Sequence, residues 1–455
     1  MPSPCRFRAL SPKGLFAVVA FVVVGLLGLG ILSPVAWGKV TFVGIDPWPR
    51  FRGPNGQGVS SYTGMLPTKW TADSALWKVR LPGSGFSSPV VWGTTVFVTA
   101  SDESAEKGFL LAYSIIDGRE LWRREFDLPR YRMNALNSAA SSTPSVDADR
   151  IVICWAIPSN LQLAAFDHLG KPLWSRDFGP TNTRHGPTIS PIIVGGLVVF
   201  AQEQEQLSAT VAAESRWMSV DVATGETKWT CVRKHSGSNS YSTPCVLEQG
   251  GKTLVIFASL AHGITAVDAA DGKVAWEVAD ALNARVCSSP VIAGDLVIAT
   301  CGEGGGGKRL TAVRPPKNPG DKPEVAYQIE DSTVTYVPTA VAYRDWLFTV
   351  HDNGTISCRN IADGKILWSE KPGGTFFGSP VIADGKLYVI TTDGTVIVLR
   401  ASDQYELLAS NPLGEKTHAT PAVSGGRLFL RTFTQLFCVG GKNVIYLPDE
   451  ATTDK

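Results

Sequence analysis

The sequence predicts an all-β protein: an eight-bladed β-propeller of four-stranded antiparallel blades, closed by an N-terminal strand that completes the last blade. Three observations lead to this prediction. A short signature containing proline recurs eight times, each copy is followed by further β-rich runs, and one strand near the N-terminus has no blade before it. Successive prolines lie 41 to 55 residues apart, a period typical of repeat folds such as propellers. The eight prolines are Pro89, Pro144, Pro191, Pro244, Pro290, Pro338, Pro380 and Pro421.

Each repeat contains four short runs that favour β-strands. In the first repeat the signature opens the first run, residues 95–99 form the second, residues 110–113 the third, and the fourth contains Trp122. The turns carry Asp-Gly pairs such as Asp117-Gly118, which supply the positive φ that tight hairpins need. Four strands joined in this way make one propeller blade.

The last repeat lacks its fourth strand. It has three runs, at about 420–424, 427–432 and 435–439, whereas residues 75–81 look like a fourth strand with no blade of their own. Trp77 precedes Pro89 by 12 residues, as Trp368 precedes Pro380. We therefore expect residues 75–81 to complete blade eight, which removes the free edges of an open sheet.

A tryptophan recurs in the fourth run of five repeats. An outermost strand must bury apolar area against the next blade, and an indole covers a large area. Five similar tryptophans in outer strands cannot all stack on one cofactor, so we expect them to pack between blades. These residues are Trp122, Trp174, Trp229, Trp276 and Trp368.

The composition excludes two classes of partner. The chain has 455 residues, of which 44% are hydrophobic, and a formal net charge of +1. Such a balance argues against nucleic acid and acidic membrane surfaces as partners. We expect a folded monomer.

The N-terminus resembles an export signal. Arg6, Arg8 and Lys13 precede an uncharged apolar stretch at residues 15–32, and a small-x-small exit follows at Ala36 and Gly38. The stretch is also just long enough to span a bilayer. We expect residues 1–38 to be either a cleaved signal or a membrane anchor, with the propeller exported to the periplasm or cell envelope. Residues 39–74 then form a turn-rich leader that docks on the propeller, residues 75–440 the propeller and residues 441–455 a tail.

The cysteines do not read as a disulfide framework or a metal site. None forms a CxxC pair, and Cys5 precedes the apolar stretch, so it cannot be a lipoprotein cysteine. The others are scattered within predicted strands, where we expect small core residues. Cys287 and Cys301 are the nearest to a pair, but their register is one residue out of step.

The repeats resemble the pyrroloquinoline-quinone-type (PQQ-like) β-propeller repeat family. The resemblance covers residues 75–440 and rests on segments such as residues 220–229 and 267–276, each with an acidic turn before a tryptophan. Residues 48–59 are similar to the leader of exported family members. Within the family, quinoprotein dehydrogenases hold PQQ and calcium with a tryptophan floor, a vicinal cysteine pair and acidic or amide ligands. This chain has neither a Cys-Cys pair nor a c-type haem motif.

The chain thus looks closer to the exported, BamB-like, non-catalytic branch. That resemblance implies a binding or scaffolding propeller of the cell envelope with a protein or peptide partner, without cofactor, metal or catalytic residues. Two alternatives stay open: a PQQ- and calcium-dependent oxidoreductase with an atypical site, and a carbohydrate- or polymer-binding module.

A ligand is expected at the channel mouth, on the face that bears the B–C loops and the links between blades. Those connections carry most of the extra chain length, and loops on a rigid scaffold are where binding is usually built. The residues before the signature prolines should converge there, and several cations among them would favour a carboxylate or an acidic peptide. Ordinary solvation of polar loops is the alternative interpretation. The site candidates are Arg184, His185, Tyr241, Arg285, Tyr336 and His418.

One further motif has a simpler explanation than ligand binding. Residues 302–309 nearly match a phosphate-binding loop, but Arg309 replaces the hydroxyl residue that would hold magnesium. We expect a plain loop between two strands.

Overall fold

The structure is a computed structural model that describes residues 41–43, 46–131, 133–157, 160–181, 185–186, 189–205, 214–234, 239–318, 320–441 and 444–446. The chain divides into residues 1–41 and residues 42–455, and the second unit contains the propeller. The predicted export signal lies outside the described residues. Among the described residues, no helix is long and apolar enough to cross a membrane.

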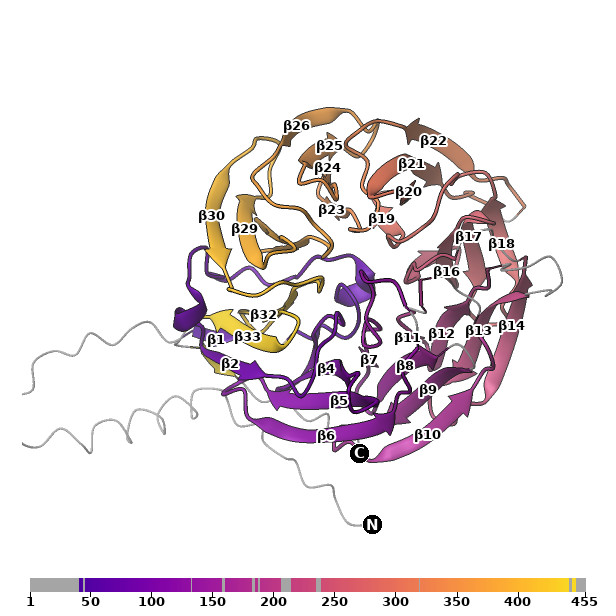
Figure 1. Cartoon of the computed structure of the whole chain (residues 1–455). Coiled ribbons are helices and arrows are strands. Elements are labelled where there is room, and N and C mark those ends of the chain that lie inside the picture. Colours follow the sequence, from indigo (N-terminus) through magenta and orange to yellow (C-terminus); the bar gives the residue numbers. More distant parts are fainter. Residues whose placement is uncertain are drawn as a thin grey trace, which may run out of the picture. The chain divides into compact units, whose positions relative to one another are not determined.

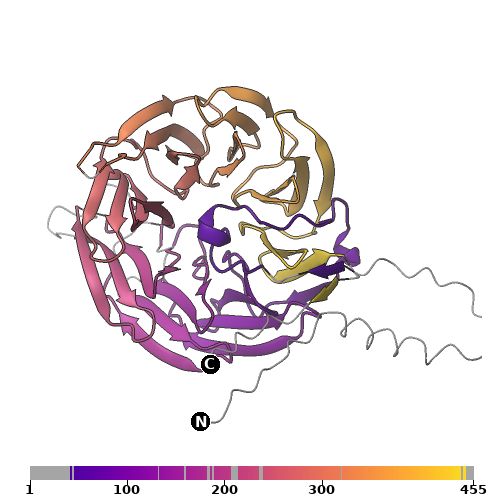
Figure 2. The same ribbon diagram turned by 180° about the vertical axis from the view of Figure 1, so that it is seen from behind.

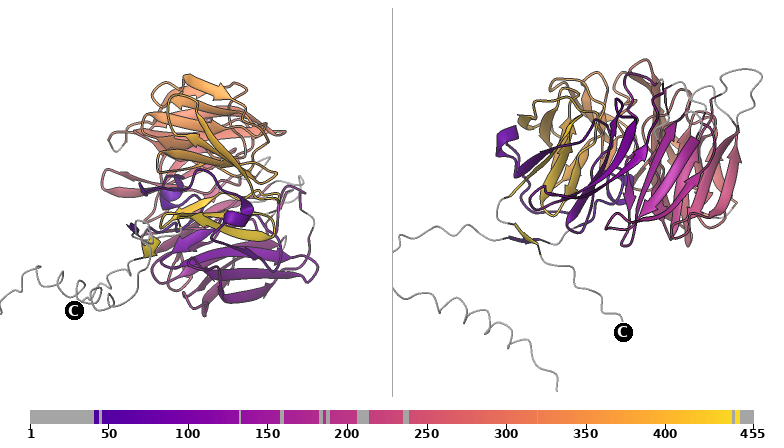
Figure 3. Two further views of the ribbon diagram at one scale, coloured as in Figure 1. Left: turned by 90° about the vertical axis from the view of Figure 1, so that its left-hand side faces the viewer. Right: turned by 60° about the horizontal axis from the view of Figure 1, so that its bottom comes forward.

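Eight four-stranded antiparallel sheets occupy the described part of this unit and are arranged as a ring (Figure 1). Figure 2 shows the same ring from behind, and Figure 3 shows two further views of its blades. The predicted fold class and blade number are confirmed.

The first four blades follow the chain order from the innermost to the outermost strand. Blade 1 is β3 (Val90–Trp92), β4 (Thr95–Asp102), β5 (Lys107–Ser114) and β6 (Glu120–Asp127); blade 2 is β7 (Ser145–Val146), β8 (Ile151–Ile157), β9 (Asn160–Phe166) and β10 (Pro172–Asp177). Blade 3 is β11 (Ile192–Val194), β12 (Leu197–Gln202), β13 (Ser215–Asp221) and β14 (Thr227–Arg233); blade 4 is β15 (Cys245–Gln249), β16 (Lys252–Ser259), β17 (Gly263–Asp268) and β18 (Val274–Val278).

The next three blades repeat this order. Blade 5 is β19 (Val291–Ala293), β20 (Leu296–Glu303), β21 (Gly306–Arg314) and β22 (Glu324–Ile329); blade 6 is β23 (Val341–Tyr343), β24 (Trp346–Val350), β25 (Ile356–Asn360) and β26 (Ile366–Glu370). Blade 7 is β27 (Val381–Ala383), β28 (Lys386–Ile390), β29 (Thr395–Arg400) and β30 (Leu407–Pro412).

Blade 8 combines the two ends of the propeller sequence. Its inner strands are β31 (Ala422–Ser424), β32 (Arg427–Arg431) and β33 (Gln435–Gly440), and its outer strand is β2 (Trp77–Arg80). Trp77 pairs with Cys438, and Arg80 with Gln435. The predicted closure by residues 75–81 is therefore confirmed.

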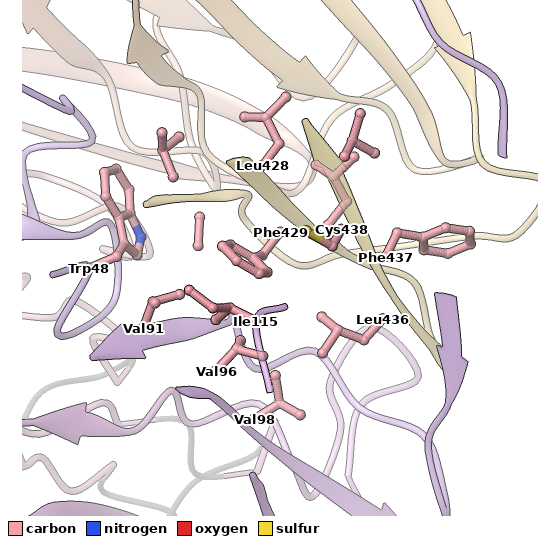
Figure 4. Packing of buried hydrophobic residues seen from close by; sticks show 14 of the residues in the cluster. Trp48, Val91, Val96, Val98, Ile115, Leu428, Phe429, Leu436, Phe437 and Cys438 are labelled. Atoms are coloured by element: carbon pink, nitrogen blue, oxygen red, sulfur yellow. The ribbon is translucent and has the colours of Figure 1, made fainter. Parts of the chain in front are cut away.

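The core lies between the blades. Successive side chains of a strand point to opposite faces of its sheet, so each inner strand contributes to two neighbouring interfaces. In blade 1, Phe97 and Leu110 pack with blade 2, whereas Val96 and Val98 pack with blade 8. Figure 4 shows the latter cluster, with Phe429 of blade 8 among its labelled residues. Burial on both faces explains why these strands are almost continuously apolar.

The recurring tryptophans join neighbouring blades, as expected. Each indole N–H donates to a carbonyl in a turn of the next blade: Trp77 to Ile115, Trp122 to His168, Trp174 to Val222, Trp229 to Ala269 and Trp368 to Ser402, at 2.8–3.0 Å. Trp276 differs, since the corresponding turn of blade 5 is the insert between β21 and β22. Its indole donates instead to Gln249 of its own blade at 3.3 Å, and Gln249 donates to Pro316 of the insert.

The first part of the leader runs along the innermost strands, in the middle of the ring (indigo in Figure 1). It contains η2 (Pro54–Gly56) and, further on, η3 (Ala72–Ser74). Innermost strands have an unpaired edge, and leader atoms pair with it in several blades. Trp48 bonds Val91 of blade 1, and Gly58 and Ser60 bond Ile382 of blade 7.

Asn55 and Gln57 bond two further blades. The Asn55 amide exchanges hydrogen bonds with Val246 of blade 4, and Gln57 accepts the N–H of Ile292 of blade 5. The buried guanidinium of Arg52 donates to Ala340 at 2.6 Å. The leader thus links blades around the channel from within.

Three further features concern a short additional sheet, the β20–β21 hairpin and the cysteines. β1 (Thr41–Val43) pairs with β34 (Val444–Tyr446), a short sheet that the sequence did not suggest. Residues 302–309 form the end of the β20–β21 hairpin, in which Gly304 and Gly305 make the turn and the flanking residues pair within the two strands. The cysteines among the described residues are free, which includes Cys287 and Cys301.

The signature of blade 6 lies two residues later in the chain than predicted. In blade 6, Thr339 takes the place that Ser289 and Ser379 hold in the adjoining blades, so Ala340 rather than Pro338 corresponds to the signature proline. The Val-Pro pair before Thr339 was mistaken for the signature because it also contains proline.

Candidate binding cavity

A ring of buried hydroxyl residues opens the innermost strands. At seven junctions among the described residues, the backbone N–H of the signature Ser or Thr donates to the hydroxyl of its counterpart in the next blade, at 2.9–3.1 Å. The last of these bonds runs from Thr420 of blade 8 to Ser88 of blade 1. The ring members are Ser88, Thr143, Ser190, Thr243, Ser289, Thr339, Ser379 and Thr420. This circuit explains why each signature carries a small hydroxyl side chain.

A second ring lies two residues before the first in each repeat. In an extended chain, residues two apart face the same way, so this position also points to the channel. Its described members all line one cavity: Phe86, Ser141, Tyr241, Cys287, Val337, Phe377 and His418. The repeat register would have found Phe86, Cys287 and Phe377, which were not among the candidates.

The cavity has a volume of about 790 Å³ and is bounded by both rings. Phe51 of the leader also lines it. Because the leader bonds the inner strands three residues beyond the hydroxyl ring, at Val91, Val246 and Ile382, it lies deeper in the channel than the cavity. The leader therefore contributes the inner end of the cavity.

Five of the six candidate residues come together here. His185, Tyr241, Arg285, Tyr336 and His418 all line the cavity, each from a different blade junction. Arg184 lies outside the described residues. Convergence is a matter of geometry, and a binding role for these side chains stays a prediction.

One wall of the cavity is polar. Arg285 donates to the hydroxyl of Tyr336 at 3.3 Å, and Cys287 lies beside them. Asp352, from the β24–β25 turn, is 8% exposed and accepts the backbone N–H groups of Tyr336 at 3.1 Å and Val337 at 3.2 Å. Burial raises the pKa of Asp352 to about 6. The carboxylate thus holds the segment that presents Tyr336.

Two further buried carboxylates position Tyr241. Glu203 and Glu205, after β12, accept the backbone N–H groups of Ser240 and Asn239 at 3.1 and 3.0 Å. Burial raises the pKa of Glu203. These acids and Asp352 could not be identified from the sequence, because nothing in a single loop shows which backbone N–H groups its carboxylates will meet.

The other wall is aromatic. The His418 ring stacks on Phe377 with 4.4 Å between centroids, packs against Phe86 at 4.5 Å and meets Phe433 edge-on at 5.2 Å. Burial, with a smaller effect from the positive charge of Lys416, lowers the pKa of His418 to about 4. His418 is therefore neutral at pH 7 and does not add to the cationic cluster that the sequence suggested.

On the remaining side of the cavity, the polar side chains are hydrogen-bonded to one another and to nearby backbone groups. The Asn137 side-chain N–H donates to the His185 carbonyl at 2.9 Å, and its oxygen accepts from Ser138 and Ser141. The Asn134 amide lies 3.1 Å from His185 Nδ1.

The donor set does not fit a quinone held by calcium. Among the described residues, no group of three or more His, Cys, Asp or Glu is placed to hold a metal ion. Asp352 is the one carboxylate in the described lining, and both its oxygens accept backbone N–H groups. The residues that the structure describes around the cavity also include no tryptophan that could serve as a stacking floor.

The chain is similar in sequence and in structure to known β-propeller proteins. A family model described as outer membrane protein assembly factor BamB matches residues 68–217, 209–318 and 328–432. The structure is similar to that of BamB from Moraxella catarrhalis, with TM-score 0.55 and 16% identity over 81% of this chain and 97% of that one.

Other solved structures share the fold. Quinohemoprotein alcohol dehydrogenase from Comamonas testosteroni matches with TM-score 0.62 and 12% identity over 87% of this chain and 80% of that one. The computationally designed Ika8 protein matches with TM-score 0.56 and 12% identity over 81% and 100%. No curated protein matches the chain. At these identities the structural likeness concerns the fold alone.

Proposed function

Because the chain belongs to the family described as outer membrane protein assembly factor BamB, we propose that it is an exported, non-catalytic propeller of the cell envelope that binds a protein or peptide partner. The family supports the binding role and the envelope location. The basic flank and apolar stretch of residues 1–38 support export, as a cleaved signal or as an anchor.

The observation that carries the proposal is the cavity. Side chains from consecutive repeats converge on a concave, preformed space of about 790 Å³, which falls in the range of ligand sites. A partner's extended segment or loop tip entering this space would meet polar and aromatic groups held by buried contacts. A cavity that is already formed on a closed scaffold keeps the ordering cost of binding low.

The cavity side chains are poorly suited to catalysis. Burial raises the pKa of the Cys287 thiol to about 12, whereas a nucleophilic cysteine needs a lowered pKa. His418 is surrounded by phenylalanine rings rather than by a hydroxyl or thiol that it could deprotonate. These features favour a binding role over covalent or general-base chemistry.

A titration with PQQ and calcium tests the proposal against the quinoprotein alternative. We expect neither stoichiometric binding, followed by absorbance, nor dye reduction with alcohols or sugars. A photo-reactive residue at Leu136, which is 57% exposed at the cavity, should cross-link one envelope protein. The same residue at Leu173, 43% exposed on outer strand β10, is the matched control and should not. Turnover with PQQ, or equal cross-linking at both positions, would refute the proposal.

A further inference from the structure

We propose that the cavity recognises a peptide segment that carries an aromatic side chain and a carboxylate a few residues apart. The proposal rests on the binding function above and names the chemistry of the ligand. Four features of the cavity support it: the aromatic wall, the arginine on the other wall, the placement of these walls across the ring, and the asparagine side chains that already have hydrogen-bond partners.

The aromatic wall is suited to an uncharged ring. Phe86, Phe377 and His418 line the cavity and pack face-on or tilted at 4.4–4.5 Å between centroids. Aromatic pairs of this kind add favourable energy beyond the area they bury. His418 is neutral at pH 7, and Lys416 places a positive charge nearby. The wall therefore disfavours a cationic side chain, although aromatic cages elsewhere bind cations.

The opposite wall is suited to an anion. Arg285 lies at the cavity with the hydroxyl of Tyr336 at 3.3 Å, and Tyr241 lines the same wall from the preceding junction. A guanidinium meets a carboxylate through two parallel hydrogen bonds, which is the geometry that arginine offers best. A phenol hydroxyl beside it can donate a further bond.

The two walls face each other because of the blade order. Phe377, His418 and Phe86 belong to the junctions of blades 7, 8 and 1, whereas Tyr241, Arg285 and Tyr336 belong to those of blades 4, 5 and 6. In a ring of eight, blade 8 is opposite blade 4, and blade 1 is opposite blade 5. A ligand that uses both walls must therefore span the channel, as a short extended peptide can.

A peptide fits the remaining groups better than an acidic sugar does. Sugar recognition relies on amide groups for the ring hydroxyls, and each of the three asparagines in the described lining already has a partner for its side chain. Asn134 and Asn137 are bonded to His185, Ser138 and Ser141, and the Asn353 oxygen accepts from Thr355. Side chains of the hydroxyl ring likewise each use one acceptor site on the backbone N–H of a neighbouring blade. An acidic saccharide is therefore an outcome of the test rather than part of the proposal.

The experiment uses blocked synthetic peptides that contain one phenylalanine and one glutamate separated by zero to three glycines. Binding to the purified propeller is measured by calorimetry. We expect at least one spacing to bind, and we expect replacement of its glutamate by glutamine, or of its phenylalanine by alanine, to weaken binding at least tenfold. These comparisons use the unaltered protein, so they do not depend on whether a variant folds.

Variants assign the two walls. Arg285→Gln should abolish the preference for glutamate over glutamine, and Phe377→Leu should reduce the preference for phenylalanine over alanine. Arg400→Gln is the matched charge control, since Arg400 is exposed beside Glu406 on the rim of blade 7. Phe126→Leu is the matched ring control, since Phe126 lies in outer strand β6, away from the cavity lining, and packs on Trp155 of β8. Both controls should leave the preferences unchanged.

Three outcomes would overturn the inference: equal binding of the glutamate and glutamine peptides, unchanged preferences in Arg285→Gln, or binding of glucuronate where no peptide binds. If cross-linking from Leu136 still captures a partner in these cases, the proposed function stands and only the ligand chemistry is wrong. Turnover with PQQ would instead remove the proposed function itself.

Discussion

At the residue scale, the cavity holds two titratable side chains whose pKa values shift in opposite directions for the same reason. Burial disfavours the charged form of each, so the pKa of Asp352 rises from 3.8 to about 6 and that of His418 falls from 6.5 to about 4. Both are therefore neutral at about pH 5. At pH 7, Asp352 alone of the two is charged.

These shifts predict a compensation in the acid stability of the protein. His418 binds a proton more readily in the unfolded state, so its contribution is present above pH 6.5 and is lost as the pH falls toward 4. Asp352 binds a proton more readily in the folded state, so its contribution is present below pH 3.8 and is lost as the pH rises through 6.

His418→Phe should therefore lose less thermal stability than the wild type between pH 7 and pH 5, and Asp352→Asn should lose more. Melting temperatures measured across this range check both signs. Each variant is compared with its own value at pH 7, so a constant loss of packing or hydrogen bonding cancels. Three parallel curves would contradict the assignment.

At the scale of elements, the leader owes its path to a run of residues with unusual backbone conformation. Arg52, Gly53, Asn55, Gly56 and Gly58 all have positive φ, which turns the chain tightly within the channel. A Cβ on Gly53 would lie 2.5 Å from the Trp48 ring, which is itself 1% exposed. Glycine is required there both by conformation and by space.

Gly53→Ala should consequently destabilise the protein more than a glycine substitution that is strained but unobstructed. Gly195 in the β11–β12 turn also has positive φ, at 53°, but a Cβ there meets nothing within 4 Å. We expect Gly195→Ala to cost about 1–2 kcal/mol from the left-handed conformation alone. Gly53→Ala should cost about 2–5 kcal/mol, because overpacking is added.

Denaturant midpoints of the two variants measure this difference. Equal midpoints would show that the leader can move away from the inner strands at little cost, and that its contacts are not what holds it there.

At the scale of the whole molecule, stability depends on closing the ring. Trp77 brings the N-terminal strand into blade 8, is 7% exposed, and bonds Ile115 of blade 1 at 3.0 Å. Its ring also lies 6.1 Å from that of Phe429. One side chain thus joins the first and last parts of the propeller sequence.

Trp77→Ala should lower the free energy of unfolding by about 3–5 kcal/mol, as for other buried aromatic residues. Hydrogen exchange should rise first in β33, whose outer partner is the strand that Trp77 anchors. Leu407→Ala is the control, since Leu407 is 46% exposed on outer strand β30 and should change stability by less than about 0.5 kcal/mol. Unchanged exchange in β33 would mean that the ring does not depend on this anchor.

The sequence alone determined what local patterns encode. Strand periodicity, Asp-Gly turns and the repeat length predicted the blades, because each depends on residues near one another in the chain. The closure pairs distant segments, but it could be predicted because residues 75–81 have no blade of their own and the last repeat lacks its fourth strand. The spacing before the signature also brought five candidate side chains to one cavity.

Only the tertiary structure decided the rest. Phe51 reaches the cavity from the leader, and the rings of Phe86 and Phe377 meet that of His418 across repeats, which no single segment reveals. The path of the leader depends on unpaired edges that exist only once the inner strands are assembled. The charge of His418 depends on desolvation by rings from two other repeats, so its neutral state could not be read from its residue type.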